Sequence, residues 1–113
     1  MLTKEQILRA DDLSREKVEI PEWGGVVFVR TLSGTERDAW ELRLSSIREK
    51  GVGDIRASLA VACVVDESGK RLFADSDIAE LGKKSWKPLD RIFDVAMRLN
   101  KMREEDVEEL AKN

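Results

Sequence analysis

The segment IPEWGGVVFVR, residues 20–30, decides how this chain can fold. Its second half, Val26 to Arg30, consists almost entirely of β-branched and aromatic residues, which favour strands. Before it, Lys17 to Ile20 alternates polar and apolar side chains with the period of a half-buried strand. Pro21 to Gly25 supplies turn chemistry between the two runs. The sequence therefore predicts a β-hairpin over about residues 17–31.

The glycine pair in this hairpin, Gly24-Gly25, is not a phosphate-binding loop. Such loops need their glycines between a strand and a helix, followed by further glycine or by Lys-Ser/Thr. Here the glycines are followed directly by a strand. The pattern therefore indicates a turn and excludes a nucleotide-binding fingerprint at this point.

Around the hairpin the apolar spacing becomes helical. Helices are expected after residues with capping side chains, in chain order Thr3, Ser33, Asp54, Asp75 or Ser76, and Ser85, and a last helix is expected after Asn100. In the opening helix we expect Ile7 and Leu8 to face inward. The chain is thus predicted to be a single α+β domain over residues 1–113, mostly helical with about four to five helices, with the hairpin near its N-terminus and a helical body over about residues 33–112.

The run from Leu59 to Val65 is apolar on every side, so we expect it at the centre of the core. Periodicity cannot separate helix from strand in so short a run. The alanines favour a helix that gives way to a strand at Val64-Val65. Cys63 lies inside this run, where a thiol in apolar surroundings is inert, and packing is the better interpretation of it.

Composition excludes several classes of function. The 113 residues are 42% hydrophobic and 38% charged, with a net charge of −3, no histidine and one cysteine. Without histidine, the commonest general base and metal ligand are missing, so we expect no enzyme, no metal and no cofactor. A lone cysteine and the lack of a long apolar run predict a cytoplasmic protein. The acid-rich loop at residues 66–77 has the wrong spacing for a calcium loop, and a polar turn is the better interpretation.

A basic cluster surrounds Trp86 and leaves a nucleic-acid hypothesis open. Its members are Lys83, Lys84, Lys87 and Arg91, and a short helix, a glycine turn and a longer helix here resemble a helix-turn-helix. Lysines after one helix and a serine cap on the next explain the same residues without DNA. A small DNA-binding regulator is therefore the alternative function.

The hairpin itself offers a protein-binding surface. On its second strand Val26 and Phe28 face one way, Val27 and Val29 the other, and only one set can reach the core unless something covers the second. An isolated two-stranded ribbon is only marginally stable in water. We expect Trp23, Val27 and Val29, and less directly Trp86, to form a contact surface for another polypeptide.

The order of these segments resembles the small tail assembly chaperones of long-tailed bacteriophages and prophages. The likeness covers Leu2 to Asn113 and is most specific in PEWGG leading to LSGTERD, residues 21–25 and 32–38, and in LGKKS, residues 81–85. Arg103 departs from the pattern, which usually has Ser or Thr there to cap the last helix. The resemblance concerns pattern and order, because none of these pieces is a catalytic motif.

The resemblance implies a non-enzymatic factor that acts in the host cytoplasm during virion assembly and is absent from the finished siphovirus tail. Such chaperones coat the tape measure protein and keep it soluble until the tube subunits polymerise around it. In many relatives a frameshifted, longer form recruits the major tail (tube) protein. Self-association is a further expected interaction, and no membrane is involved.

Overall fold

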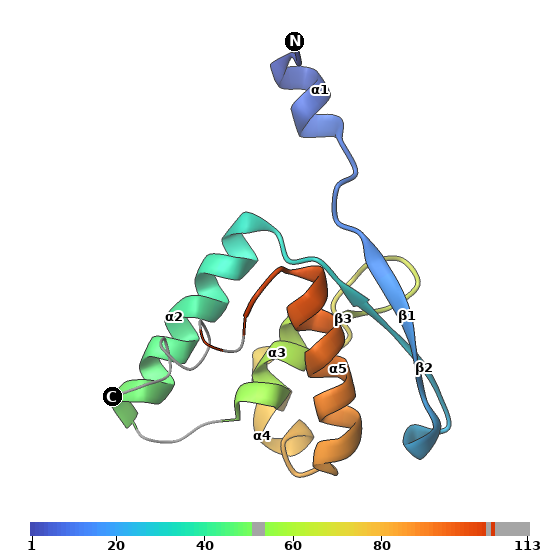
Figure 1. The fold of residues 1–113 in the computed structure, drawn as a ribbon, viewed down its shortest axis with the longest axis vertical. Coiled ribbons are helices and arrows are strands. Elements are labelled where there is room, and N and C mark those ends of the chain that lie inside the picture. The colour runs from blue at the N-terminus through green and yellow to red at the C-terminus, as the bar shows by residue number, and fades with distance from the viewer. Residues whose placement is uncertain (51–53, 104, 106–113) are drawn as a thin grey trace.

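The chain folds as a three-stranded antiparallel sheet packed against helices, so the predicted α+β class is confirmed (Figure 1). The structure, a computed structural model, describes residues 1–50, 54–103 and 105. The predicted last helix after Asn100 falls largely outside these residues. In chain order the elements are α1 (Lys4–Arg9), β1 (Arg15–Ile20), the 3-10 turn η1 (Pro21–Trp23), β2 (Gly25–Arg30), α2 (Gly34–Lys50), α3 (Ile55–Cys63), β3 (Val64–Val65), the 3-10 turn η2 (Asp75–Asp77), α4 (Ile78–Leu81) and α5 (Trp86–Leu99).

The predicted hairpin is formed by β1 and β2, which pair in antiparallel register from Arg15↔Arg30 to Ile20↔Gly25. Gly24 closes the tip in the left-handed region, at φ 75°, where a residue without a Cβ atom has no steric cost. The short strand β3, which was expected to follow α3, adds to the other edge of β2 opposite Phe28 and Val29. The third strand therefore supports the base of the hairpin and not its tip.

The helix α3 lies at the centre of the core, as its all-round apolar sequence predicts. Leu59, Ala60 and Cys63 are completely buried. On one side α5 packs against both α3 and the hairpin. The strand residues Ile20 and Val29, also fully buried, fill the space between them. Of the helices in the described ranges, every one is too short or too polar to cross a bilayer.

The opening helix α1 stands away from the rest of the chain (Figure 1). Its predicted cap is present, because the Thr3 hydroxyl accepts from the Gln6 amide at 3.2 Å. The prediction that Ile7 and Leu8 face inward is wrong, since their exposed fractions are 56% and 73%. The extended linker after α1 carries it off the body, so its apolar side chains have no core to enter. We call residues 1–13 the N-terminal arm.

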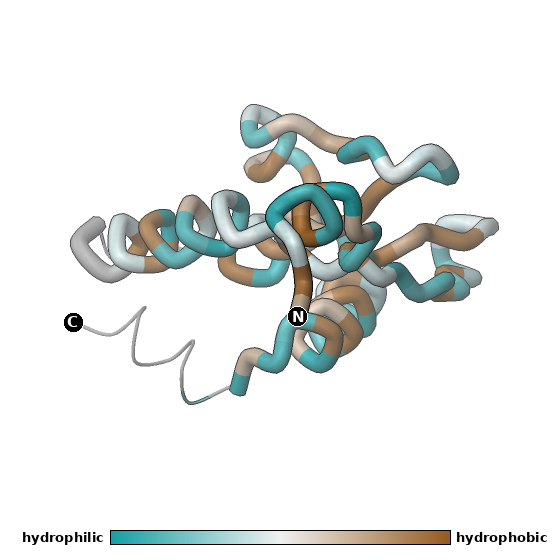
Figure 2. The backbone as a smooth tube through the Cα atoms, turned by 90° about the horizontal axis from the view of Figure 1, so that it is seen from above, coloured by the Kyte–Doolittle hydropathy of each residue, from teal (hydrophilic) through white to brown (hydrophobic). Residues whose placement is uncertain are grey.

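The helix α2 begins at the predicted capping box and projects to the left in Figure 2. The Glu36 amide donates to the Ser33 hydroxyl at 3.2 Å, and the Ser33 amide donates to the Glu36 carboxylate at 2.9 Å. Hydrophobic and hydrophilic residues alternate along this helix (Figure 2), and Trp40 and Leu44 are its buried members. These two side chains attach α2 to the body.

Candidate functional site

Trp23 and Trp86, the two predicted contact residues with indole side chains, lie on the surface. Trp23 sits in η1 at the hairpin tip and is 38% exposed, while Trp86 opens α5 and is 63% exposed. Large aromatic side chains are the residues that most often anchor protein interfaces. Both indoles are therefore available to a partner.

The prediction that Val27 and Val29 belong to an exposed contact surface was wrong. Val29 is completely buried and Val27 is half-buried against the core, whereas Val26 is 46% exposed. Val27 pairs with Val18, which is also buried, so the two strands turn these side chains to the same face, the one that α5 covers. Val26, together with Trp23, is thus the apolar residue that the hairpin presents to solvent.

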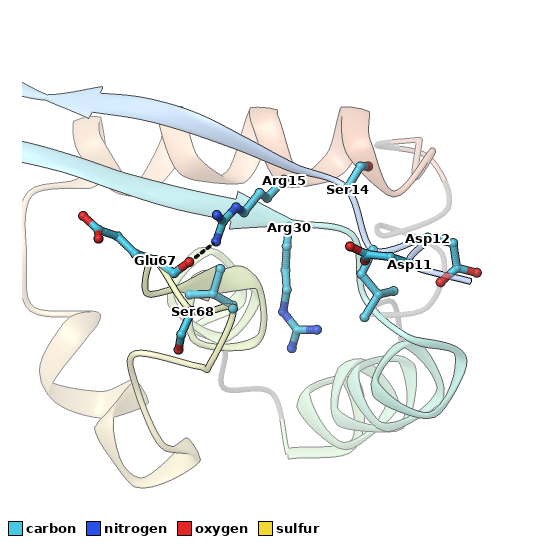
Figure 3. A pocket seen from close by; sticks show the side chains of 10 residues that line it. Asp11, Asp12, Ser14, Arg15, Arg30, Glu67 and Ser68 are labelled. Carbon is cyan, nitrogen blue, oxygen red and sulfur yellow. Dashed lines mark hydrogen bonds between the residues drawn. The ribbon is translucent and has the colours of Figure 1, made fainter. Parts of the chain in front are cut away.

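The base of the outer hairpin face is covered by the turn at residues 66–70. Arg15 lies over the Phe28 ring at 4.8 Å and donates to the carbonyl oxygen of Glu67 at 2.6 Å (Figure 3). Asp66 organises this turn, because its carboxylate accepts from the Ser68 hydroxyl and from the Ser68 and Lys70 amides. These bonds also hold the pKa of Asp66 below its usual value. The residues therefore form a structured turn, as predicted, and only the tip of the hairpin stays uncovered.

A cavity of about 540 Å³ lies between this turn and the root of the N-terminal arm (Figure 3). Arg30 extends from β2 into the space between Asp11 and Ser68. Its guanidinium forms an ion pair with Glu36. Burial alone would raise the pKa of Glu36, but the hydrogen bonds from Arg30 and Ser33 keep it below the usual value. The pair ties β2 to the start of α2, so its function is structural.

The single thiol and the acidic side chains of the described residues are not arranged for nucleophilic attack or for metal binding. Burial raises the pKa of the Cys63 thiol to about 12, so the thiolate needed for nucleophilic attack does not form near neutral pH. Among the described residues no group of three or more acidic or sulfur ligands is placed to hold a metal ion.

The hairpin tip is tied to α5 by an ion pair between Glu22 and Arg91. The Arg91 Nη1 and Nη2 atoms donate to the two carboxylate oxygens of Glu22 at 2.7 and 2.8 Å. These hydrogen bonds lower the pKa of Glu22 to about 2, and the positive charge of Lys87 acts in the same direction. The ion pair therefore brings the segment that carries Trp23 to the first turns of α5, which carry Trp86.

We expect the Glu22 carboxyl group to titrate near pH 2 in the folded chain. In Arg91→Gln the midpoint should return toward the ordinary value of 4.5, because the main hydrogen bonds are lost. Since the folded-state pKa is depressed, the contribution of the pair to stability is complete above the unfolded-state pKa and is lost as the pH falls toward 2. Carboxyl carbon NMR during an acid titration measures both midpoints, and an unchanged midpoint in Arg91→Gln would contradict the assignment.

The residues of the nucleic-acid alternative are only partly available to a nucleic acid. Lys83, Lys84 and Lys87 are exposed, and none pairs with a carboxylate in the described part of the chain. Arg91, however, is already engaged by Glu22 through both terminal nitrogens. The helix before α5 is α4, which has only 4 residues. A helix-turn-helix needs a longer first helix to cross the backbone, so this arrangement lacks one.

Fold and surface together define a small α+β domain with two exposed indoles, Trp23 in η1 and Trp86 at the start of α5. The model of the phage tail assembly chaperone family matches residues 3–113. The chain therefore belongs to the phage tail assembly chaperone family, which confirms the resemblance seen in the sequence. This is a family of chaperones and not of enzymes, and a part in tail assembly implies protein partners.

The fold is also similar to a solved structure, that of the bacteriophage HK97 tail assembly chaperone. The two superpose with a TM-score of 0.63, covering 88% of this chain and 95% of the HK97 chain. Their sequences are 18% identical, so the likeness concerns the fold. None of the curated proteins compared with the chain matches it significantly.

Proposed function

We propose that this chain binds the tape measure protein and keeps it soluble while the tail is built. The observation that carries the proposal is the pair of exposed indoles, Trp23 and Trp86, with the segment of Trp23 joined to the helix of Trp86 by the Glu22–Arg91 ion pair. A chaperone for a long apolar partner needs uncovered apolar side chains on a body that stays folded without the partner. Family membership supports the same role.

We also propose a location and further partners for the chain. The chain acts in the host cytoplasm before the tail is complete, and it is absent from the finished particle. A longer form of the chain would supply the contact to the tail tube protein. Self-association is supported by the N-terminal arm, because Leu2, Ile7 and Leu8 are exposed there.

Co-expression with the tape measure protein tests the proposal. The wild-type chain should raise the soluble fraction of the tape measure protein, and the two should purify together. The double variant Trp23→Ala with Val26→Lys, and Trp86→Ala on its own, should each weaken co-purification about tenfold or more, because truncating an interface hot spot costs about 2 kcal/mol or more. Both sites are exposed, so the helical circular dichroism signal should stay unchanged.

The matched controls are Leu42→Ala and Leu72→Ala, since both leucines are exposed apolar residues on other segments, Leu42 in α2 and Leu72 between β3 and η2. They should solubilise the tape measure protein as the wild-type chain does. If the wild-type chain leaves the tape measure protein insoluble, the proposed function is wrong. If the tryptophan variants solubilise it fully, the function stands and the contact surface is elsewhere.

A further inference from the structure

We propose that Glu22 and Arg91 are positioning residues for partner binding: their ion pair holds the hairpin tip, and with it Trp23, at a set place relative to Trp86. The inference rests on the proposed function, since it concerns the surface that binds the partner. The two indoles come from distant parts of the sequence, and Glu22 and Arg91 are themselves 69 residues apart.

The geometry of the pair is suited to fixing an orientation. Both oxygens of Glu22 accept from Arg91, at 2.7 and 2.8 Å, and the guanidinium uses both terminal nitrogens. A bidentate contact of this kind fixes the relative orientation of the two side chains as well as their distance, which a single lysine contact does not. The tip is therefore held in one orientation against α5.

The tip has few other supports. The strand β3 pairs only with Phe28 and Val29, at the base end of the hairpin. At the tip, Ile20 is the last residue in the core, and no residue of η1 is buried. Beyond Ile20, a single 3-10 turn closed by Gly24 carries Trp23. The placement of that indole thus depends on the contact between the neighbouring Glu22 and α5.

The pair contributes little to the stability of the fold. Both side chains are more than a third exposed, and solvent screens such pairs strongly. The hairpin stays anchored without it, because Val18, Ile20 and Val29 are buried in the core. The value of the pair lies in binding: a partner that uses both indoles loses less conformational entropy when they are already in place.

The test uses Glu22→Gln, Arg91→Gln and the charge exchange Glu22→Arg with Arg91→Glu. The probe is a set of overlapping synthetic peptides that covers the tape measure protein, and affinity is measured by fluorescence titration for the peptide that binds the wild-type chain most tightly. We expect each single variant to bind about two- to fivefold more weakly, because a screened ion pair can favour the positioned tip by no more than about that factor. The charge exchange should recover most of the affinity, while the melting temperatures of all three stay close to that of the wild-type chain.

A second readout needs no partner. With 5-fluorotryptophan in the chain, the fluorine resonance of Trp23 should shift or change width in both single variants and return in the charge exchange. The resonance of the buried Trp40 should not move. A purely structural role for the pair would instead lower the melting temperature and move all the tryptophan resonances together.

The chain contains a matched control. Glu16 and Arg98 form another exposed ion pair between β1 and α5, at 2.6 Å, far from the tip along the strand. Glu16→Gln should therefore bind the peptide as tightly as the wild-type chain. If Glu22→Gln also binds as tightly as the wild-type chain, if the charge exchange restores nothing, or if Glu16→Gln loses as much affinity, the positioning role is wrong while the proposed function can stand. If no peptide binds the wild-type chain, both are wrong.

Discussion

Replacing Trp40 by alanine is expected to lower the free energy of unfolding by about 3–5 kcal/mol, the usual cost of truncating a buried tryptophan. Trp40 is 4% exposed and faces α3. Its indole Nε1 donates to the Ser58 hydroxyl at 3.3 Å, and that hydroxyl donates in turn to the Ile55 carbonyl at 2.8 Å. Because α2 packs on the body chiefly through α3, the loss should loosen the whole helix.

Urea unfolding followed by circular dichroism measures this change. Leu42→Ala is the matched control on the same helix, since Leu42 is 74% exposed. It should change the free energy of unfolding by less than about 0.5 kcal/mol. A loss of less than about 1 kcal/mol in Trp40→Ala would show that other contacts hold α2, because buried truncations rarely cost so little.

Replacing Asn100 by alanine is expected to cost about 2–3 kcal/mol, because it leaves a buried hydrogen-bond donor without a partner. The Asn100 Oδ1 atom accepts from the Leu32 amide at 2.8 Å, and Nδ2 donates to the Ala96 carbonyl at 2.9 Å. Leu32 lies in the link between β2 and α2, whereas Asn100 ends α5. The side chain thus joins the end of α5 to the link between β2 and α2, and hydrogen exchange at the Leu32 amide should become faster in the variant.

The neighbouring position provides the control for Asn100. Lys101 is exposed and has φ 50°, a left-handed conformation that costs a residue with a Cβ atom about 1 kcal/mol. Lys101→Gly should therefore be as stable as the wild-type chain or more stable by up to about 1 kcal/mol. If Asn100→Ala is as stable as Lys101→Gly, the side-chain bonds of Asn100 do not support the fold as described.

Local chemistry explains most of what could be predicted. Thr3, Ser33 and Ser85 were recognised as caps because a hydroxyl beside the first helical turn has amide donors within reach whatever the rest of the chain does. The turn from Pro21 to Gly25 was recognised for a similar reason, since Gly24 adopts the conformation that few other residues tolerate. Trp23 was expected at the surface because it stands at the tip of the hairpin.

The expected cap at Asp75 or Ser76 was wrong, because the 3-10 turn η2 follows Ala74 and α4 follows Asp77. The other wrong predictions concern which side of an element meets the core. A strand with apolar residues on both faces has the same alternating pattern whichever face is buried, so the sequence did not separate Val27 and Val29 from Val26 and Phe28. Ile7 and Leu8 fit an inward-facing helix equally well. In both cases the answer depends on the position of another element, α5 for the strand and the extended linker for α1.

The sequence by itself determined the hairpin and the caps at Thr3, Ser33 and Ser85, because each depends on neighbours within a few residues. Its unbroken apolar run likewise placed α3 in the core. Only the tertiary structure decided the rest. It buried Val29, left the N-terminal arm uncovered, and joined Glu22 to Arg91 across 69 residues. The physical reason is that such contacts depend on how α5 packs across the sheet, and no short stretch of residues contains that information.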